Sequence, residues 1–412
     1  MSTFERALEQ AIQIFGLEGN LKPQQKDAIS GFIEEKKDSF VVLPTGYGKS
    51  LCFFLLPLIL DLMFSQDCFI IIISPLRWLI ESQLQLIHEK NLKAINLTQH
   101  KEGMDLTNVK YIFTTPETLI SPKTTLLQSE TTKQRLKGFI MDEAHCILNW
   151  GDSFRPSYSK LMKAFDKTQN IRKMALTATA SDETIKKISQ NLKFQENFKT
   201  TIVREQRHNI KIIFKKTLQV NQQLNALLDE LYSKLFDTPK TLVFCPQLKL
   251  AAHCYNFFKY YSTDDVFPLF QSFMSTTEER TKRYIIENFM KPDSRIRILF
   301  ATNAFGMGID VQGIVRVIHI LPPRTLDDYI QQIGRAGRAN ERCEAEIYFN
   351  TSKKDQAEEF KVPIKTSKEM KEFLEIDQCR REYIAEHYHL EKRNLPPREC
   401  CDWCEENRMS DL

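Results

Sequence analysis

The chain has 412 residues, of which 42% are apolar and 27% are charged, and its formal net charge is +4. This composition is that of an ordinary folded globular protein, and the length exceeds what one hydrophobic core usually organises, so we expect two or three domains. So small a charge does not by itself indicate a nucleic-acid partner, and any basic surface must be local.

The chain opens with MSTFERALEQAIQIF (residues 1–15), which has the spacing of an amphipathic helix and lacks the charged-then-apolar pattern of a signal peptide. The most apolar stretch covers residues 51–64, but it contains Pro57 and Asp61 and is too short to span a bilayer. We therefore predict a buried helix there, in a protein that is neither secreted nor inserted in a membrane. Without secretion, most of the ten cysteines are expected to be reduced.

Short β-branched runs alternate with longer helical patterns through most of the chain. The first set of predicted strands covers residues 40–43, 69–74, 111–115, 139–142 and 174–179, with a predicted helix over 78–90. A second set follows at residues 241–245, 297–302, 315–320 and 346–349. Continuous apolar strands separated by helices predict parallel sheets covered on both faces. The predicted fold is therefore α/β, with domains at 1–204 and 205–350 that join at the polar stretch 205–208, and a small helical module at 351–412.

A phosphate-binding loop is predicted at PTGYGKS (residues 44–50), which follows the first strand and precedes the apolar helix. Its two glycines, Gly46 and Gly48, let the backbone curl so that N–H groups face phosphate oxygens, and the helix N-terminus adds a positive dipole. Lys49 can reach the β- and γ-phosphates, and the Ser50 hydroxyl can ligate Mg²⁺. The alternative is a glycine turn with a solvated lysine, against which the flanking strand and helix argue.

Two carboxylates end the predicted strand at 139–142, in the sequence DEAH. They therefore lie at the carboxyl edge of the sheet, where α/β proteins bind ligands. Asp142 would hold Mg²⁺ through water, and Glu143 would orient and deprotonate the attacking water. Acidic pairs are also common on solvated loops, but a pair that follows a phosphate loop and again ends a strand favours catalysis. The sequence TAT (residues 177–179) follows the next strand and can link these carboxylates to a moving part.

Two further motifs follow strands of the second set, FATNAFGMGID (residues 300–310) and QQIGRAGR (residues 331–338). Phosphoryl transfer gains most from cations placed on the γ-phosphate. Arg335 and Arg338 can complete the site from the opposite domain, so that hydrolysis requires a closed arrangement. A surface Arg-Gly turn is the alternative.

The ordered set PTGYGKS, IIISPLRWLIESQ, TTPETL, DEAHCILNWGDSFRPSY, LTATAS, FATNAFGMGID and QQIGRAGR resembles a RecQ-type DNA helicase of superfamily 2 over residues 21–404. The resemblance implies two tandem RecA-like domains and a small zinc-binding module. It also implies ATP- and Mg²⁺-dependent 3′-to-5′ translocation on single-stranded DNA with separation of duplex ahead, in DNA repair or recombination. On this basis we expect a nuclear protein if the source is eukaryotic and a cytoplasmic one otherwise. We also expect a short form without the winged-helix and HRDC domains of the family.

The resemblance assigns roles to individual residues. Those expected to bind ATP and Mg²⁺ are Gln25, which reads adenine, and Thr45, Gly46, Gly48, Lys49, Ser50, Asp142, Glu143 and Asp310. Those expected to act as arginine fingers are Arg335 and Arg338. Those expected to contact single-stranded or partly duplex DNA are Ser74, Thr115, and Trp150, Phe154 and Arg155 of an aromatic-rich loop.

Four cysteines near the end of the chain resemble the zinc module of that family: Cys379, Cys400, Cys401 and Cys404. Structural zinc sites need four ligands in tetrahedral positions, and Cys401 with Cys404 forms a C-x₂-C half-site. Cys400 is adjacent to Cys401, which demands an unusual backbone. A metal-free tail, or a site completed by His387 or His389, is therefore the alternative.

The chain also departs from the RecQ pattern. Lys22 replaces an arginine, and no aromatic residue lies between Gly16 and Gln25 to stack on adenine, so we expect looser nucleotide selectivity. Asp152 and Ser153 replace a histidine and an aspartate of the aromatic-rich loop, so we expect weaker coupling between DNA and hydrolysis. Two other functions stay open, an RNA-directed helicase and a DNA-binding or strand-annealing protein that unwinds little.

Overall fold

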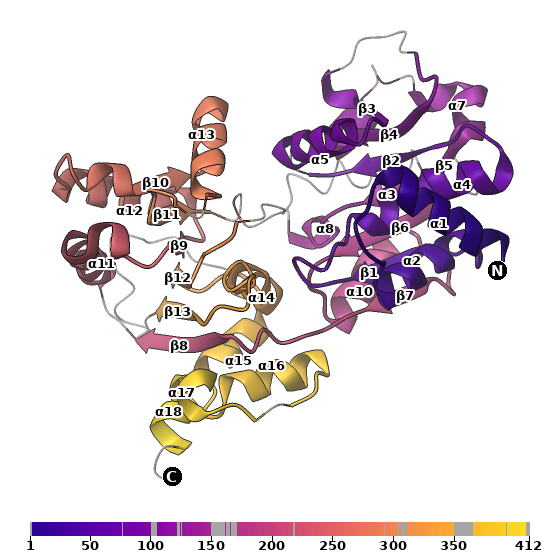
Figure 1. Ribbon diagram of the computed structural model, residues 1–412. Coiled ribbons are helices and arrows are strands. Elements are labelled where there is room, and N and C mark those ends of the chain that lie inside the picture. Colours follow the sequence, from indigo (N-terminus) through magenta and orange to yellow (C-terminus); the bar gives the residue numbers. More distant parts are fainter. Residues whose placement is uncertain are drawn as a thin grey trace. The chain divides into compact units, whose positions relative to one another are not determined.

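The computed structural model of the chain describes residues 2–75, 77–99, 105–121, 124, 126–149, 161, 165, 171–216, 219–291, 293–302, 305, 311–349, 366–392 and 394–408. The chain divides into two compact units, Met1–Arg204 and Glu205–Leu412. Each unit contains its own parallel sheet (Figure 1).

The N-terminal unit is built on a sheet whose described strands run in the order β3-β4-β2-β5-β6-β1-β7, all parallel. These strands are β1 (Ser39–Val42), β2 (Phe69–Ile73), β3 (Lys93–Asn96), β4 (Val109–Thr114), β5 (Leu136–Met141), β6 (Arg172–Thr177) and β7 (Lys199–Ile202). The helices are α1 (Thr3–Phe15), α2 (Pro23–Ile33), α3 (Leu51–Phe54), α4 (Leu56–Phe64), α5 (Arg77–Glu89), α6 (Pro116–Leu119), α7 (Glu130–Arg135), α8 (Cys146–Asn149) and α10 (Asp182–Asn191), with 3₁₀ turns η1 (Leu97–Gln99) and η2 (Leu126–Gln128).

Both faces of this sheet are covered, which explains why its central strands are continuous apolar runs. Ile70 and Ile72 of β2 belong to one buried cluster, and Ile71 and Ile73 belong to another. Successive side chains of a strand point to opposite faces, so the two clusters are the two cores of the unit.

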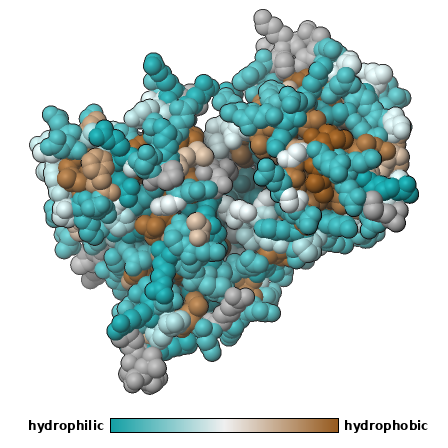
Figure 2. Space-filling model, in the orientation of Figure 1, coloured by the Kyte–Doolittle hydropathy of each residue, from teal (hydrophilic) through white to brown (hydrophobic). Residues whose placement is uncertain are grey.

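The apolar stretch predicted as one buried helix forms two, because the helix breaks at Leu55 between α3 and α4. Pro57 lies in the first turn of α4, where a residue without an N–H is tolerated. Among the described helices, none has the length and apolar character needed to cross a bilayer. The surface seen in Figure 2 is mostly hydrophilic, with separate apolar areas.

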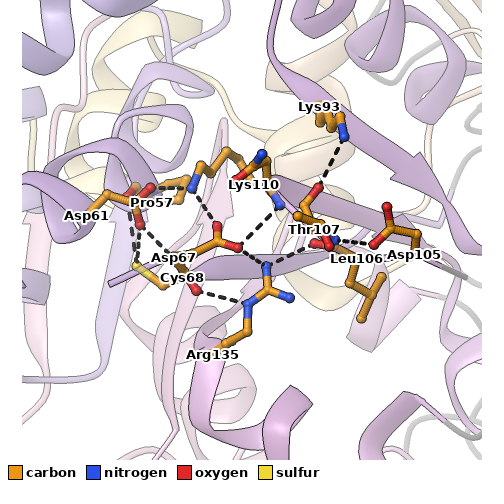
Figure 3. Close-up of polar contacts among 11 residues, drawn as sticks. Pro57, Asp61, Asp67, Cys68, Lys93, Asp105, Leu106, Thr107, Lys110 and Arg135 are labelled. Atoms are coloured by element: carbon orange, nitrogen blue, oxygen red, sulfur yellow. Dashed lines mark hydrogen bonds and ion pairs between the residues drawn. The ribbon is translucent and has the colours of Figure 1, made fainter. Parts of the chain in front are cut away.

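A network of charged side chains joins the strands at the amino edge of this sheet (Figure 3). Lys110 of β4 donates to Asp61 at the end of α4, and to Asp67 Oδ1 at 2.8 Å. Arg135, directly before β5, donates to Asp67 Oδ2 at 2.6 Å and to the Asp67 carbonyl at 2.9 Å. The backbone N–H of Cys68, directly before β2, donates to Asp61 Oδ1 at 2.9 Å. Because two cations face two carboxylates, the network fixes β2, β4 and β5 relative to one another without leaving an unpaired charge.

The C-terminal unit contains a second parallel sheet, with its described strands in the order β10-β11-β9-β12-β13-β8. The strands are β8 (Ile210–Lys216), β9 (Thr241–Phe244), β10 (Phe270–Phe273), β11 (Ile298–Ala301), β12 (Arg316–Ile320) and β13 (Cys343–Phe349). The helices are α11 (Val220–Lys234), α12 (Leu248–Tyr261), α13 (Glu279–Phe289), α14 (Leu326–Ile333), α15 (Lys368–Glu375), α16 (Arg380–Tyr388), α17 (Pro397–Cys400) and α18 (Asp402–Arg408), with 3₁₀ turns η3 (Leu235–Asp237) and η4 (Phe267–Leu269). The last four helices gather beside β8, drawn in yellow in Figure 1.

The α/β prediction, with two parallel sheets, is confirmed, and every strand predicted from an apolar run exists. Among the strands of the described residues, four were missed, namely β3, β7, β8 and β10. Each of them is the outermost strand at one end of its sheet.

Candidate active site

The phosphate loop has the curled backbone that its glycines predict. Gly46 has a φ of +82° and Gly48 a φ of +87°, and only glycine adopts such angles without strain. A Cβ at position 48 would also lie 2.6 Å from the Nε2 atom of Gln25. The loop leads from β1 into α3, which begins at Leu51. Glycine at position 48 therefore avoids backbone strain and also leaves room for the Gln25 amide.

The Gln25 side chain is hydrogen-bonded to the backbone of the phosphate loop. Its Nε2 donates to the carbonyls of Tyr47 (2.9 Å) and Gly48 (3.1 Å), and its Oε1 accepts from the backbone N–H of Lys22 at 2.8 Å. The amide is thus engaged within the protein, and its reading of adenine stays a prediction. Tyr47 was not singled out from the sequence. Its hydroxyl donates to Gln24 at 2.6 Å and its ring lies 3.8 Å from the Lys22 ammonium, so this loop supplies an aromatic ring that the segment before Gln25 lacks.

The loop lysine and the DEAH carboxylates meet at the carboxyl edge of the N-terminal sheet. Lys49 Nζ lies 3.8 Å from Glu143 Oε2, and the two side chains are 13% and 5% exposed. His145 Nδ1 lies 3.5 Å from the same carboxylate oxygen and 3.1 Å from the hydroxyl of Thr177. That hydroxyl donates to the Thr179 carbonyl at 3.0 Å. His145, the histidine of DEAH, therefore connects the DEAH carboxylate to the TAT motif.

Asp142 is buried, and both of its carboxylate oxygens accept hydrogen bonds. Oδ1 accepts from the backbone N–H of Glu143 at 3.0 Å, and Oδ2 accepts from Gln83 Nε2 at 2.9 Å. Burial raises the pKa of Asp142, and the neighbouring Glu143 charge raises it further, while Lys49 opposes both effects. A divalent cation would offset the negative charge of this pair, and hard oxygen donors such as Asp142 and the Ser50 hydroxyl suit Mg²⁺. These residues therefore fit the predicted magnesium site.

Gln83 is a site residue that the sequence analysis missed. It lies on the buried face of α5, together with the apolar residues Leu79, Ile80 and Ile87. The sequence does contain a signal for this residue, namely an amide in the middle of an otherwise apolar helical face. A polar side chain buried there needs a hydrogen-bond partner. Asp142 is that partner.

Replacing Gln83 by methionine, which has a similar shape but no donor, is expected to lower kcat and raise the Mg²⁺ concentration for half-maximal activity. Partners that hold a metal ligand typically change affinity or activity by about 10–100-fold when removed. A Mg²⁺ titration of ATP hydrolysis measures both effects. Gln85→Met is the matched control, because Gln85 lies on the exposed face of the same helix, where its Nε2 donates to Glu89 Oε1 at 2.9 Å. Equal Mg²⁺ dependence in the two variants would contradict this role.

Ser74 and Thr115, predicted to contact DNA, follow the neighbouring strands β2 and β4. The backbone N–H of Ser74 donates to the Thr114 carbonyl at 3.0 Å, which places the two segments side by side. Ser74 is fully buried and Thr115 is 5% exposed. The Thr115 hydroxyl caps α6 by accepting from Thr118 N–H at 3.3 Å. Their contact with DNA stays a prediction.

Other predicted residues lie outside the described residues, so the structure places none of them. They are Trp150, Phe154 and Arg155 of the aromatic-rich loop, its departures Asp152 and Ser153, and Asp310.

The two predicted arginine fingers belong to the C-terminal unit and follow α14. Arg335 is 3% exposed and Arg338 is partly exposed. Between them, Gly337 has a φ of +64°, and its N–H donates to the Ile314 carbonyl at 3.0 Å. The loop therefore has a fixed backbone, and its action on nucleotide stays a prediction.

The four cysteines predicted as zinc ligands come together in the structure. Their sulfur atoms all lie within 4.8 Å of one another and all four residues are buried. Cys379 Sγ lies 3.5 Å from Cys400 Sγ and 3.9 Å from Cys401 Sγ. Zinc–sulfur bonds of about 2.3 Å at tetrahedral angles place sulfurs about 3.8 Å apart, so these residues fit zinc.

The adjacent pair, Cys400 and Cys401, joins one cluster because the backbone changes direction between them. Cys400 is the last residue of α17, while Cys401 is extended (φ −160°, ψ 170°) and α18 begins at the next residue. Cys401 also forms a parallel bridge to Ile212 of β8. Neither His387 nor His389 belongs to the cluster found among the described residues.

Comparison with known proteins defines the class to which this fold and site belong. Residues 22–188 match the DEAD/DEAH box helicase family, and residues 222–340 match the helicase conserved C-terminal domain. The helicase MrfA bound to DNA is similar with a TM-score of 0.67, at 16% identity over 86% of this chain and 52% of that one. Dbp5 of S. cerevisiae, bound to RNA and ADP BeF3, is similar with a TM-score of 0.62, at 19% identity over 84% of this chain and 88% of that one. These likenesses show the fold, which is that of RecA-like helicases.

Sequence relatives narrow the class. The ATP-dependent DNA helicase RecQ of Synechocystis sp. is 30% identical over 81% of this chain and 69% of its own length. The probable ATP-dependent DNA helicase RecS of Bacillus subtilis is 31% identical over 79% of this chain and 63% of its own length. The bifunctional 3′-5′ exonuclease/ATP-dependent helicase WRN of Mus musculus is 30% identical over 93% of this chain and 28% of its own length. The chain belongs to the RecQ family of helicases, and it spans only part of the length of these relatives.

Proposed function

We propose that this protein is an ATP-dependent DNA helicase that moves 3′ to 5′ along single-stranded DNA and separates the duplex ahead of it. The observation that carries the proposal is the meeting of Lys49 with Glu143, beside the buried Asp142, at the carboxyl edge of the N-terminal sheet. A lysine on a phosphate loop and a carboxylate pair at this edge are the parts that nucleotide hydrolysis needs.

Each residue has one task in the proposed reaction. Lys49 neutralises charge on the transferred phosphate, and Glu143 orients the attacking water and accepts its proton. Asp142 and the Ser50 hydroxyl hold Mg²⁺, which when bound offsets negative charge on the phosphate oxygens. Arg338, with Arg335, adds positive charge from the C-terminal unit, so that hydrolysis follows domain closure.

The proposed division of labour follows the chain. Residues 1–204 bind ATP and carry the aromatic-rich loop, residues 205–350 carry the arginine fingers, and residues 351–412 form a zinc-binding module. Within the aromatic-rich loop, Trp150 and Phe154 stack on bases and Arg155 binds the DNA backbone, because stacking accepts every base. We assign the protein to DNA repair or recombination, in the nucleus if its source is eukaryotic.

The test compares ATP hydrolysis without nucleic acid, with single-stranded DNA, and with single-stranded RNA of the same sequence. We expect DNA to stimulate hydrolysis severalfold and RNA to stimulate it little. Unwinding of duplexes with a 3′ or a 5′ single-stranded tail then reports polarity, and only the 3′-tailed duplex should separate.

Each contrary result points to a different function. Equal stimulation by RNA indicates an RNA-directed helicase. Stimulation by DNA without any unwinding indicates a DNA-binding or strand-annealing protein. No stimulation by either nucleic acid contradicts a coupled motor.

A further inference from the structure

The first residues of the C-terminal unit, 205–210, are hydrogen-bonded to the loop that carries the two predicted arginine fingers. Arg207 donates through Nη2 to the carbonyls of Ala336 (3.1 Å) and Gly337. Asn209 donates through Nδ2 to the carbonyls of Gly337 and Glu341, each at 2.8 Å. Both side chains therefore bond to peptide carbonyls between the fingers, and Asn209 also bonds to one three residues after Arg338.

The contact is tight enough to restrict the loop. Gly337 has a φ of +64°, a conformation that favours glycine. A Cβ at this position would clash with the Asn209 amide and would lie 3.0 Å from Cys343 Sγ. The loop backbone thus has one arrangement that keeps the bonds to Arg207 and Asn209.

Arg381 of α16 joins this segment to the cysteine cluster. Its buried guanidinium donates to the carbonyls of Cys400 (3.3 Å), Arg207 (3.0 Å) and Ile210. The Gln206 amide makes two contacts with Arg381. Its Nε2 donates to the Arg381 carbonyl at 2.9 Å, and its Oε1 lies 3.4 Å from Arg381 Nη1. A buried cation with this many acceptors holds its neighbours in place, because moving any of them leaves a buried charge poorly solvated.

We propose that Arg207 and Asn209 are positioning residues for Arg338, and that Arg381 connects the cysteine cluster to them. This inference rests on the proposed function, in which Arg338 acts on the γ-phosphate. A group that stabilises a transition state must be held to within about 0.5 Å, and its peptide plane sets where its side chain begins. The cysteine cluster then serves catalysis through a chain of hydrogen bonds, in addition to stabilising the fold. Since residues 205–210 follow the boundary between the units, a displacement of this segment acts directly on the finger loop.

Asn209→Asp is the sharpest test, because it keeps the shape of the side chain and turns the donor into an acceptor facing two carbonyls. We expect kcat for ATP hydrolysis to fall about 10–100-fold, as misplacement of a catalytic group by about 1 Å does. The dissociation constant of a fluorescent ATP analogue should stay within about twofold, since the phosphate loop lies in the other unit. Asn288→Asp is the matched control, because Asn288 on α13 also donates to a carbonyl, that of Tyr284 (2.8 Å), at the surface.

A double-mutant cycle with Arg338→Ala separates positioning from general damage. If Asn209 acts through Arg338, Asn209→Asp should not slow single-turnover hydrolysis any further in the Arg338→Ala background. Rate losses that multiply would overturn the proposal, and so would an Asn209→Asp rate equal to that of the Asn288→Asp control. If Asn209→Asp lowers the melting temperature, Arg207→Lys takes its place in the same cycle with the same criteria.

The failure of this inference differs from the failure of the proposed function. If Arg338→Ala leaves hydrolysis unchanged, the finger role in the proposed function is wrong, and the positioning role is wrong with it. If Arg338→Ala stops hydrolysis while Asn209→Asp and Arg207→Lys do not affect it, only the positioning role is wrong.

Discussion

Lys49→Ala is expected to lower kcat for DNA-stimulated ATP hydrolysis by at least about 100-fold, the usual effect of removing one group that stabilises transition-state charge. Lys49 is only 13% exposed and lies 3.8 Å from Glu143, so its charge acts where water screens it weakly. Phosphate release at saturating ATP and single-stranded DNA measures the loss.

Lys133→Ala is the control for Lys49→Ala. Lys133 also pairs with a carboxylate of the N-terminal unit, Glu130 at 2.7 Å, but this pair is at the surface and should not affect hydrolysis. A Lys49→Ala protein that keeps a substantial part of its stimulated rate would remove the phosphate loop from the proposed mechanism.

Removal of zinc is expected to have the second large effect, on stability. Structural zinc binds zinc-finger peptides with roughly 10–16 kcal/mol, so even partial coupling to folding should lower the stability of the C-terminal unit by more than about 3 kcal/mol. We expect about one zinc per purified chain by elemental analysis, and an earlier thermal transition after treatment with a chelator.

Cys401→Ser should lose both the zinc and the stability. Cys343→Ser is its control for metal content, because Cys343 is also buried but lies outside the cluster, with its Sγ 3.6 Å from the Ile314 carbonyl. A chain purified without zinc, or a Cys401→Ser variant that retains it, would contradict a structural zinc site.

The sequence predicts the interior of both sheets and fails at their edges. The strands found from apolar runs are central, where helices cover both faces. The strands that were missed, with sequences such as KAIN in β3 and KTTI in β7, are outermost in their sheets and mix polar with apolar residues. An outermost strand has a neighbour on one side alone, so its composition resembles that of a loop.

The candidate site shows the same limit in another form. The phosphate-loop glycines and the DEAH carboxylates could be proposed from sequence, because each motif consists of residues that are close together in the chain and follow a predicted strand. Gln83, Tyr47 and Asn209 were missed, because each meets a partner far away along the chain: Asp142, Lys22 and Gly337. Only the folded chain shows which distant residues meet.

The adjacent cysteines were a different case. Sequence spacing made a shared metal appear difficult, because two neighbouring side chains rarely converge. Cys401 has an extended backbone between two short helices, and this lets the Cys400 and Cys401 side chains point to one cluster. The spacing of cysteines in the sequence does not reveal such a change of backbone direction.

Glu143 has a φ of +50°, an angle at which residues with a side chain are strained by about 1 kcal/mol or more. The residue proposed to activate water therefore has a backbone conformation in which glycine would be less strained. A glycine at position 143 would relieve this strain and stabilise the fold, but it would remove the carboxylate that the proposed hydrolysis needs. Stability and activity therefore place opposite demands on this position. Glutamine keeps the strained backbone and the size of the side chain, and removes the basicity together with the negative charge that faces Lys49. Glu143→Gln therefore tests the chemistry of this carboxylate without relieving the backbone strain.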